Sequence, residues 1–90
     1  MYTPVYTRQF TKDVQRCRRR GKSLEKFKSV ARSLLAGEPL DLIHRDHRLV
    51  GNFIGRRECH IESDWLLVYR LAGDRMHFER MGTHSDLFKI

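Results

Sequence analysis

The chain has 90 residues, with 18 Lys and Arg against 11 Asp and Glu, which gives a formal net charge of +7 and an isoelectric point near 10.0. This length predicts a single domain, residues 1–90, and the charge favours a polyanionic partner: nucleic acid, the ribosome, an anionic membrane or an acidic protein. No stretch approaches the roughly 18 apolar residues of a membrane span, and the N-terminus lacks the apolar segment of a signal peptide. We therefore expect a cytoplasmic protein, with Cys17 and Cys59 as reduced structural thiols.

Two basic amphipathic helices are predicted after a short N-terminal strand, residues 2–6, in which Pro4 favours an edge position. Between Arg8 and Arg32 there are ten Lys or Arg and only two acidic residues, so this segment carries +8 and the rest of the chain is nearly neutral. Apolar residues recur three or four positions apart in both helices, and Gly21 and Ser23 mark the boundary between them. The pair is predicted to be apolar on one side and basic on the other.

The pattern changes to strands in the second half of the chain. Strands are predicted at residues 49–54, 57–61, 65–71 and 76–81, with a tight turn between the last two. The run WLLVYRL is nearly all apolar and is expected at the centre of the sheet, and the final HSDLFKI is expected to add a helical turn. The fold class is therefore α+β in the order β-α-α-β-β-β-β, with an antiparallel sheet and two helices packed on one face.

Ionisable side chains gather at one edge of this predicted sheet. In a meander, the end of the second strand, the start of the third and the end of the fourth meet at the same edge. The residues placed there are His60, Asp64, Arg80 and His84. His47 begins a strand that runs the opposite way, while His44 and His77 have neither position nor motif in their favour.

These residue types suit the cleavage of RNA without a metal. Histidine titrates near neutral pH, so a pair of histidines can remove the proton of the attacking 2′-hydroxyl and protonate the departing 5′-oxygen. Arg80 offers a planar set of donors that matches phosphate, and Asp64 can orient a histidine. Trp65 or Phe88 can stack on a base.

Each candidate also has a structural interpretation. A single histidine is more often a surface side chain than a catalyst, and Trp65 begins the central strand and so equally suits the core. Arg80 can form a surface ion pair with Glu79 or Asp64, and such pairs are weak. A zinc or manganese site on His60 and Asp64 matches no strong spacing, so no metal is predicted. The convergence of base, acid, cation and aromatic candidates at one edge favours an enzyme.

The sequence resembles the YafQ-type toxins of bacterial toxin–antitoxin systems, in the RelE/ParE superfamily, over nearly the whole chain. The resemblance rests on FTKDV in the first helix, then on DH-x-L-x-G, H-x-x-x-DW-x-L-x-Y and F-x-R-x-GTH-x-x-L-F. It implies a single small RelE-like toxin domain over residues 1–90. It also implies ribosome-dependent, metal-independent cleavage of mRNA, and inhibition by a cognate acidic antitoxin, DinJ-like and dimeric. The catalytic residues that it implies are His47, His60, Asp64, Arg80, His84 and Phe88. The family more often has Asp at the position of Glu58, so no role is assigned to Glu58.

The motif leaves the individual roles open, with His84 or His47 as base, His60 or His84 as acid, and Arg80 on the scissile phosphate. The basic segment is predicted to bind ribosomal RNA through its phosphates. The residues predicted to contact RNA are Arg16, Arg18, Arg19, Arg20, Lys22, Lys26 and Trp65. Two alternatives remain: a ParE-like toxin that inhibits DNA gyrase without cutting RNA, and a non-catalytic basic module that binds RNA or an antitoxin.

Overall fold

The computed structural model describes residues 1–88, and the last two residues of the predicted domain and of the HSDLFKI segment lie outside the described part. Its elements in chain order are β1 (Thr3–Tyr6), α1 (Arg8–Arg19), α2 (Leu24–Leu35), the 3-10 turn η1 (Leu42–His44), β2 (His47–Arg48), the 3-10 turn η2 (Gly51–Phe53), β3 (Arg57–Glu62), β4 (Trp65–Ala72), β5 (Arg75–Gly82) and α3 (His84–Phe88). The five strands form one sheet in the order β1-β5-β4-β3-β2. The predicted α+β class is confirmed. Within residues 1–88, no helix has the length and apolar character needed to cross a membrane.

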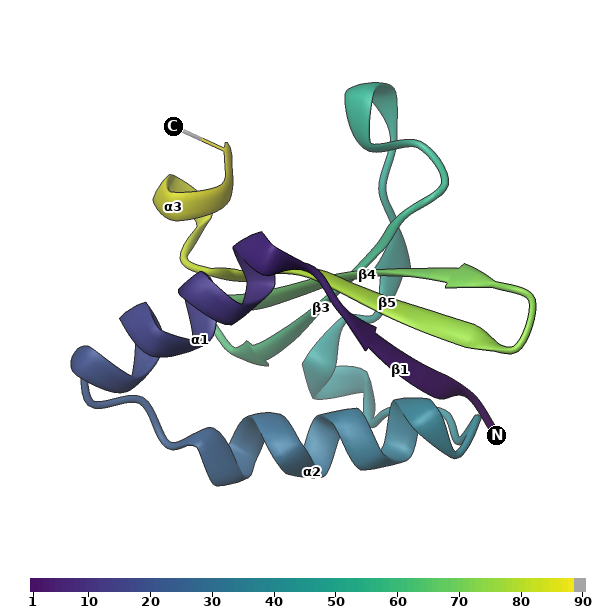
Figure 1. Ribbon diagram of the computed structural model, residues 1–90, viewed down its shortest axis with the longest axis horizontal. Helices are drawn as coiled ribbons and strands as arrows, with labels where there is room; N and C mark the ends of the chain where they lie inside the picture. The colour runs from purple at the N-terminus through teal and green to yellow at the C-terminus, as the bar shows by residue number, and fades with distance from the viewer. Residues whose placement is uncertain (89–90) are drawn as a thin grey trace.

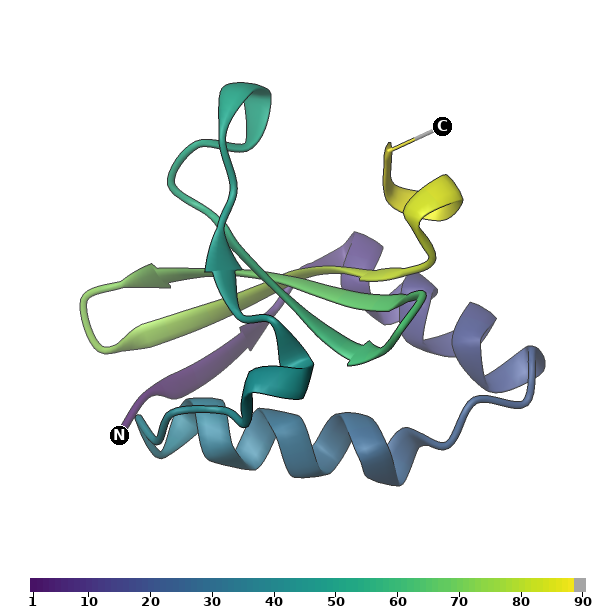
Figure 2. The ribbon, with the colours of Figure 1, turned by 180° about the vertical axis from the view of Figure 1, so that it is seen from behind.

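The sheet has a helical layer on one side and shorter segments on the other. Helix α2 runs beneath the sheet and α1 lies at one end of it, whereas α3 and the loop before β3 rise above it (Figure 1). The view from behind shows the turn η1 between α2 and the edge of the sheet (Figure 2). Apolar side chains of both helices pack with those of the sheet in one core, so the predicted packing on one face is confirmed.

Strand β4 is central, as its apolar run predicts, and it is buried on both faces. Trp65, Leu67 and Tyr69 point into the core with the helices, while Leu66 and Val68 form a smaller apolar cluster on the opposite face. Successive side chains of a strand alternate between faces, so an unbroken apolar run requires cover on both. The cover on the second face comes from α3 and from the segment after β2.

Strand β1 departs from the predicted antiparallel sheet. It lies at the edge, as Pro4 suggests, but it pairs with β5 in parallel. The other three strand pairs are antiparallel. A pairing between residues near the two ends of the chain leaves no local signal, since neither a turn nor a repeat links the two strands.

Helix α1 continues along the edge of β5 where β1 ends. Thr7, its N-cap, donates its backbone N–H to the Phe78 carbonyl at 3.2 Å and accepts the N–H of Phe10 through its hydroxyl. Further along, Met81 donates its N–H to Asp13 Oδ2 at 2.9 Å, and Arg16 donates to the Met81 carbonyl at 3.2 Å. Side chains of a helix thus supply the hydrogen bonds that a neighbouring strand would otherwise make.

The predicted strand at residues 49–54 is wrong. Only His47–Arg48 pair with β3, and the chain then forms a loop that stands above the sheet (Figure 1). Gly51 and Gly55 have φ of +67° and +89°, a left-handed conformation that interrupts an extended strand and favours glycine. Ile54 is 76% exposed, so the apolar residues of this segment do not mark a buried strand.

Candidate active site

The predicted catalytic side chains meet on the side of the sheet that faces away from α2. Glu58 lies opposite Val68 and Val68 opposite Arg80, so these three residues form a row across the sheet. His60 lies opposite Leu66 in the next row. Since adjacent strands are about 4.8 Å apart, the Glu58 and Arg80 backbones lie about 10 Å apart. We call these five residues the histidine face; it has acidic and basic groups on either side of an apolar floor.

A β-bulge places Arg80 on this face. Phe78 and Met81 both point into the core, and the pairing of β4 with β5 shifts register between them. Two residues, Glu79 and Arg80, therefore lie between two core residues where a regular strand has one. Without the shift, the alternation of side chains would place Arg80 on the same side as Phe78.

His84 begins α3 and is held by Asp64, in the turn between β3 and β4. Asp64 Oδ1 accepts from the His84 backbone N–H at 2.9 Å and from His84 Nδ1 at 2.6 Å. These hydrogen bonds, the backbone one first, lower the pKa of Asp64, so the carboxylate stays ionised. When Nδ1 carries the proton and donates it in this hydrogen bond to Asp64, the lone pair of the His84 ring is on Nε2.

Glu58 is a buried carboxylate between two histidines. Its Oε1 lies 3.6 Å from His47 Nε2 and 3.5 Å from His60 Nε2. His47 Nδ1 lies 2.6 Å from the Arg45 carbonyl, and His60 Nδ1 lies 3.2 Å from the Ser63 carbonyl. Both nitrogens of each ring therefore lie near oxygen atoms, and the Nδ1 atoms are placed to donate to the two backbone carbonyls. No role is predicted for Glu58 from the sequence, although its spacing of two from His60 places both on one face of a strand.

A cavity of about 550 Å³ lies beside His60, between η1 and the turn that joins β3 to β4. His44, which the sequence analysis set aside, belongs to this region. Its Nδ1 donates to the His60 carbonyl at 2.7 Å, where β3 no longer has β2 as a neighbour. His44 therefore supports the backbone of a candidate catalytic residue, and nothing in its sequence position indicates this.

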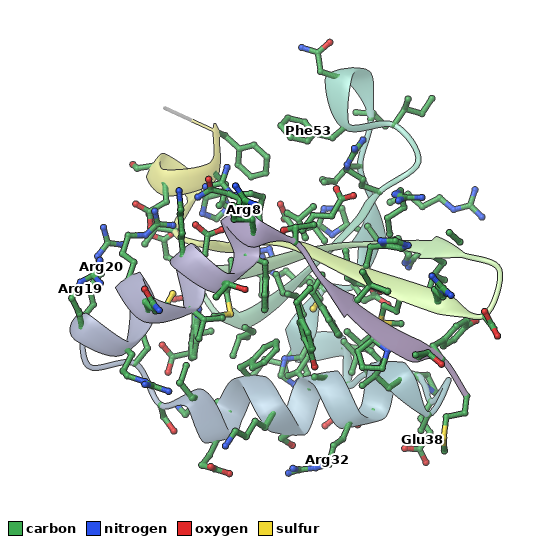
Figure 3. All side chains as sticks on the ribbon, viewed as in Figure 1. Arg8, Arg19, Arg20, Arg32, Glu38 and Phe53 are labelled. Atoms are coloured by element: carbon green, nitrogen blue, oxygen red, sulfur yellow. The ribbon has the colours of Figure 1, made fainter. Side chains whose placement is uncertain are left out.

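Aromatic rings border the histidine face. The Phe88 ring centroid lies 6.4 Å from that of His84, and Phe53 meets Phe88 edge to face at 5.2 Å. Figure 3 shows the Phe53 ring pointing from the loop toward α3. Phe88 also packs on the small apolar cluster of β4, so a ring that is predicted to stack on RNA is anchored in the fold.

The predicted ion-pair partners of Arg80 are wrong. Glu79 pairs with Arg56 and Arg70, and Asp64 pairs with His84. Arg80 instead donates to Asp13 of α1, with Nε at 2.8 Å from Oδ2. Its side chain is 31% exposed, so part of the guanidinium reaches solvent.

Most of the cations predicted to bind RNA form ion pairs within the chain. The pairs are Arg16–Asp13 at 2.9 Å, Arg20–Asp86 at 2.6 Å, Lys22–Glu62 at 3.0 Å and Lys26–Glu62 at 2.7 Å. Arg16 also donates to the Met81 carbonyl of β5, so its role is to hold α1 against this strand. Arg18, Arg19 and Arg20 are exposed, and Arg19 and Arg20 project from the end of α1 (Figure 3). Ion pairs at the surface are weak, so all these cations except Arg16 remain available to phosphates.

The predicted contact between Trp65 and RNA does not agree with the structure. Trp65 is 1% exposed and lies in the main core with Cys17. The Lys22 ammonium lies 5.6 Å from the centre of its ring, on a surface that a base would need. Trp65 is therefore a packing residue, the interpretation that its place at the start of the central strand also allows.

Asp86 fixes α3, and with it His84, to the rest of the fold. The Asp86 N–H donates to Thr83 Oγ1 at 3.1 Å, and the Thr83 N–H donates to Asp86 Oδ2 at 3.0 Å, which is a capping box. Arg20 donates to the same carboxylate at 2.6 and 3.2 Å. The Arg20 hydrogen bond is the main reason why the pKa of Asp86 lies well below its usual range.

The stability that Asp86 contributes is expected to depend on pH. Because folding lowers the pKa of this carboxyl, its contribution is complete above the unfolded-state pKa of about 4 and is lost as pH falls toward the folded-state pKa. Asp86→Asn is expected to reduce the free energy of unfolding by about 1 kcal/mol at pH 7, and by less at pH 3. Urea unfolding at pH 7, 5 and 3 measures this, with Asp74→Asn in the β4–β5 turn as control. A loss that stays constant across these pH values would contradict the assignment.

Glu58, His60 and His84 also form a group that can hold a metal ion. Their potential ligand atoms all lie within 4.8 Å of one another. Two imidazole nitrogens and a carboxylate oxygen suit Zn²⁺ or Cu²⁺. The metal site considered from the sequence used His60 and Asp64. In the structure Asp64 is not in this group, and its oxygen accepts from Nδ1 and the backbone N–H of His84.

Fold and site together define a small basic α+β protein with acid–base groups on one face, and comparisons place it among the toxins of type II toxin–antitoxin systems. The model of the family described as "bacterial toxin of type II toxin-antitoxin system, YafQ" matches residues 2–89. The chain is 39% identical over 84 residues to the mRNA interferase toxin YafQ of Escherichia coli K12, covering 92% of this chain and 91% of that protein. The chain therefore belongs to the YafQ family, and the resemblance predicted from its motifs is confirmed.

Solved structures agree with this assignment. The toxin in a crystal structure of the E. coli DinJ–YafQ complex is similar with a TM-score of 0.90 and 37% identity, covering 98% of this chain and 99% of that one. A copper-bound mutant toxin from Helicobacter pylori is similar with a TM-score of 0.94 and 35% identity, covering 98% of this chain and 100% of that one. That second relative is copper-bound in its crystal structure.

Proposed function

We propose that this chain is a ribosome-dependent endoribonuclease that cuts mRNA by attack of a 2′-hydroxyl on the adjacent phosphorus, with side chains alone as catalysts. The observation that carries the proposal is the close group of His84, His60 and Glu58 on the face that also bears Arg80. A base, an acid and a cation are the three groups that this reaction requires. The relation to the E. coli mRNA interferase supports the same reaction.

His84 is assigned as the general base. Asp64 accepts a hydrogen bond from Nδ1–H at 2.6 Å, so Nε2 is free to take the proton of the 2′-hydroxyl. The resulting imidazolium is stabilised by the adjacent carboxylate, as in other histidine–carboxylate pairs. The 2′-oxygen then forms a bond to phosphorus, which leads to a 2′,3′-cyclic phosphate.

His60 is assigned as the general acid. Its two nitrogens face the Ser63 carbonyl and the Glu58 carboxylate, an arrangement that an imidazolium satisfies. The Nε2 proton is transferred to the departing 5′-oxygen as the phosphorus–oxygen bond breaks, which leaves a 5′-hydroxyl. His47 faces the same carboxylate and supports the positive charge of this region. The ring centroids of His60 and His84 lie 5.8 Å apart, so the two rings can act on opposite sides of one phosphate.

Arg80 is assigned to the phosphate itself. It lies across Val68 from Glu58, and His60 lies in the next row beside Glu58. A phosphodiester above the apolar floor would therefore have the Arg80 guanidinium on one side and the general acid, His60, on the other. Negative charge grows on the phosphoryl oxygens in the transition state, and a fixed guanidinium stabilises it. Phe88, beside His84, is assigned to stacking on an adjacent base.

The ribosome and an antitoxin are the proposed partners. The exposed cations of α1 and α2 would contact ribosomal RNA, and the ribosome would present the mRNA in a fixed position. A relative is seen in complex with DinJ, so we propose a cognate acidic antitoxin, DinJ-like and dimeric, for this chain. With these partners, we propose that the chain acts in the cytoplasm.

Binding to ribosomes is expected to weaken steeply as salt rises, because each phosphate contact releases counterions. Arg18→Ala with Arg19→Ala removes two exposed cations and is expected to lower the slope of log affinity against log salt by about 2. Co-sedimentation with ribosomes at several salt concentrations measures this slope. Arg75→Ala, at the first residue of β5, is the matched control, and an equal slope for all three proteins would contradict the assignment.

The function is tested by induced expression in bacteria, followed by mapping of mRNA 5′ ends. Growth arrest with new 5′-hydroxyl ends in translated mRNA is the expected result. Intact mRNA with broken DNA would favour the gyrase-inhibiting alternative. Binding to an antitoxin without growth arrest would favour the non-catalytic module.

Metal ions are expected to inhibit this reaction. When bound, Zn²⁺ or Cu²⁺ would occupy the nitrogen lone pair of His84 that the mechanism assigns to the base, with His60 and Glu58 as further ligands. Micromolar Zn²⁺ at constant Mg²⁺ is therefore expected to reduce cleavage by programmed ribosomes, and a chelator selective for transition metals is expected to leave it unchanged. Loss of cleavage with that chelator would show instead that the reaction requires a metal.

A further inference from the structure

Asp13 is a fully buried carboxylate in the middle of α1, and the proposed reaction does not use it. It is 0% exposed. Its two oxygens accept from Arg80 Nε at 2.8 Å and Nη2 at 3.4 Å, from the Met81 N–H at 2.9 Å, from Arg16 at 2.9 Å and from Gln9 at 3.1 Å. It is the acidic residue of the FTKDV motif. A buried charge is unfavourable unless it is paired and hydrogen-bonded, and here it has both kinds of partner.

The contact with Arg80 has a particular geometry. Asp13 faces the edge of the guanidinium that carries Nε and one terminal nitrogen, so two of the five N–H groups of Arg80 point into the fold. The other three lie away from Asp13, and the Arg80 side chain is 31% exposed. A long side chain on an open sheet face would otherwise have many rotamers, whereas this one is held at its charged end.

The position of Arg80 is therefore determined from two sides. The bulge in β5 places the residue on the histidine face, and Asp13 comes from a helix at the edge of the same strand. Asp13 also binds the N–H of Met81, the next residue along β5, so one carboxylate fixes both the backbone and the guanidinium. Arg16 also pairs with Asp13 and provides a second positive charge. The negative charge of Asp13 is therefore balanced by two arginines and not by Arg80 alone.

We propose that Asp13 is a positioning residue that orients the Arg80 guanidinium toward the scissile phosphate. This inference rests on the proposed function, because it concerns the residue assigned to the phosphate. An arginine that is already fixed stabilises the transition state without reorganising during the reaction, whereas a mobile one must first be ordered. Asp13 itself has no contact with the RNA.

The first test is a double-mutant cycle on single-turnover cleavage by programmed ribosomes. Asp13→Asn is expected to slow cleavage about 10- to 100-fold, because a misplaced catalytic group costs rates of this order. In the Arg80→Ala background, Asp13→Asn is expected to change the rate by less than about threefold, because the group that it orients is gone. Full multiplication of the two losses, or an unchanged rate in Asp13→Asn alone, would overturn the proposal.

Gln9→Ala is the matched control. It removes another hydrogen bond to the same carboxylate, at 3.1 Å, without touching Arg80. It is expected to lower the unfolding temperature while the cleavage rate stays within about threefold of the parent chain, because a merely structural loss does not misplace the guanidinium. A rate loss in Gln9→Ala as large as that in Asp13→Asn would mean that Asp13 acts through stability alone.

A second measurement is made on the parent chain and does not depend on catalysis. In the nitrogen-15-labelled parent chain, the Nε–H of Arg80, assigned by its loss in Arg80→Lys, is expected to exchange slowly with water and to be rigid by relaxation. A mobile, rapidly exchanging Arg80 would overturn the proposal. A rigid Arg80 in a chain that cuts no mRNA would instead refute the proposed function and leave the positioning by Asp13 in place.

Discussion

Replacing His84 by alanine is expected to slow mRNA cleavage by about 10² to 10⁴-fold, the range that general acid–base catalysis contributes. The loss has a direct cause, since His84 is the histidine whose orientation is fixed by an ionised carboxylate, Asp64, at 2.6 Å. Single-turnover cleavage on programmed ribosomes measures the rate, and urea unfolding checks that the fold is intact. His84 is 41% exposed at its side chain, so its removal is expected to change stability little.

His77→Ala provides the comparison for this variant. His77 lies in β5, where it pairs with Val5 and Arg70, and it does not belong to the group of Glu58, His60 and His84. Its variant is expected to cut mRNA at the parental rate. Cleavage at the parental rate by His84→Ala would remove His84 from the mechanism and transfer the role of base to His47, the alternative that the sequence motif leaves open.

Replacing Trp65 by alanine is expected to lower the free energy of unfolding by about 3 to 5 kcal/mol, because a large buried side chain is lost and a cavity remains. Trp65 is 1% exposed, and domains of this size have only about 5 to 15 kcal/mol in total. The variant is therefore expected to lose a large share of its stability. Far-UV circular dichroism in urea is the appropriate measurement, since the chain has a single Trp and the variant has no Trp fluorescence.

Trp65→Leu separates packing from RNA stacking. Leucine retains apolar volume in the core but cannot stack on a base, so this variant is expected to be less destabilised than Trp65→Ala and to cut mRNA normally where it is folded. Loss of cleavage in a fully folded Trp65→Leu chain would restore the stacking role that the sequence analysis considered.

Local patterns in the sequence determine much of this protein. The helix periodicity, the glycine after α1 and the unbroken apolar run of β4 predict those elements close to their observed bounds. The strand order of a meander also brings His60, Asp64 and His84 together, because their positions at strand ends follow from turns that the sequence itself marks. The membership of the YafQ family follows from motifs that are spread along the chain.

Only the tertiary structure decides the features that depend on distant contacts. The parallel pairing of β1 with β5, the ion pair of Asp13 with Arg80 and the approach of Glu58 to His47 join residues that no local pattern relates. The loop at residues 49–54 shows the converse, since this apolar segment is interrupted by Gly51 and followed by Gly55, both with positive φ, and does not continue the strand. Periodicity reports which face of an element is buried, whereas the partner of a buried charge is determined by packing alone, and for Arg80 that partner lies in a helix 67 residues away.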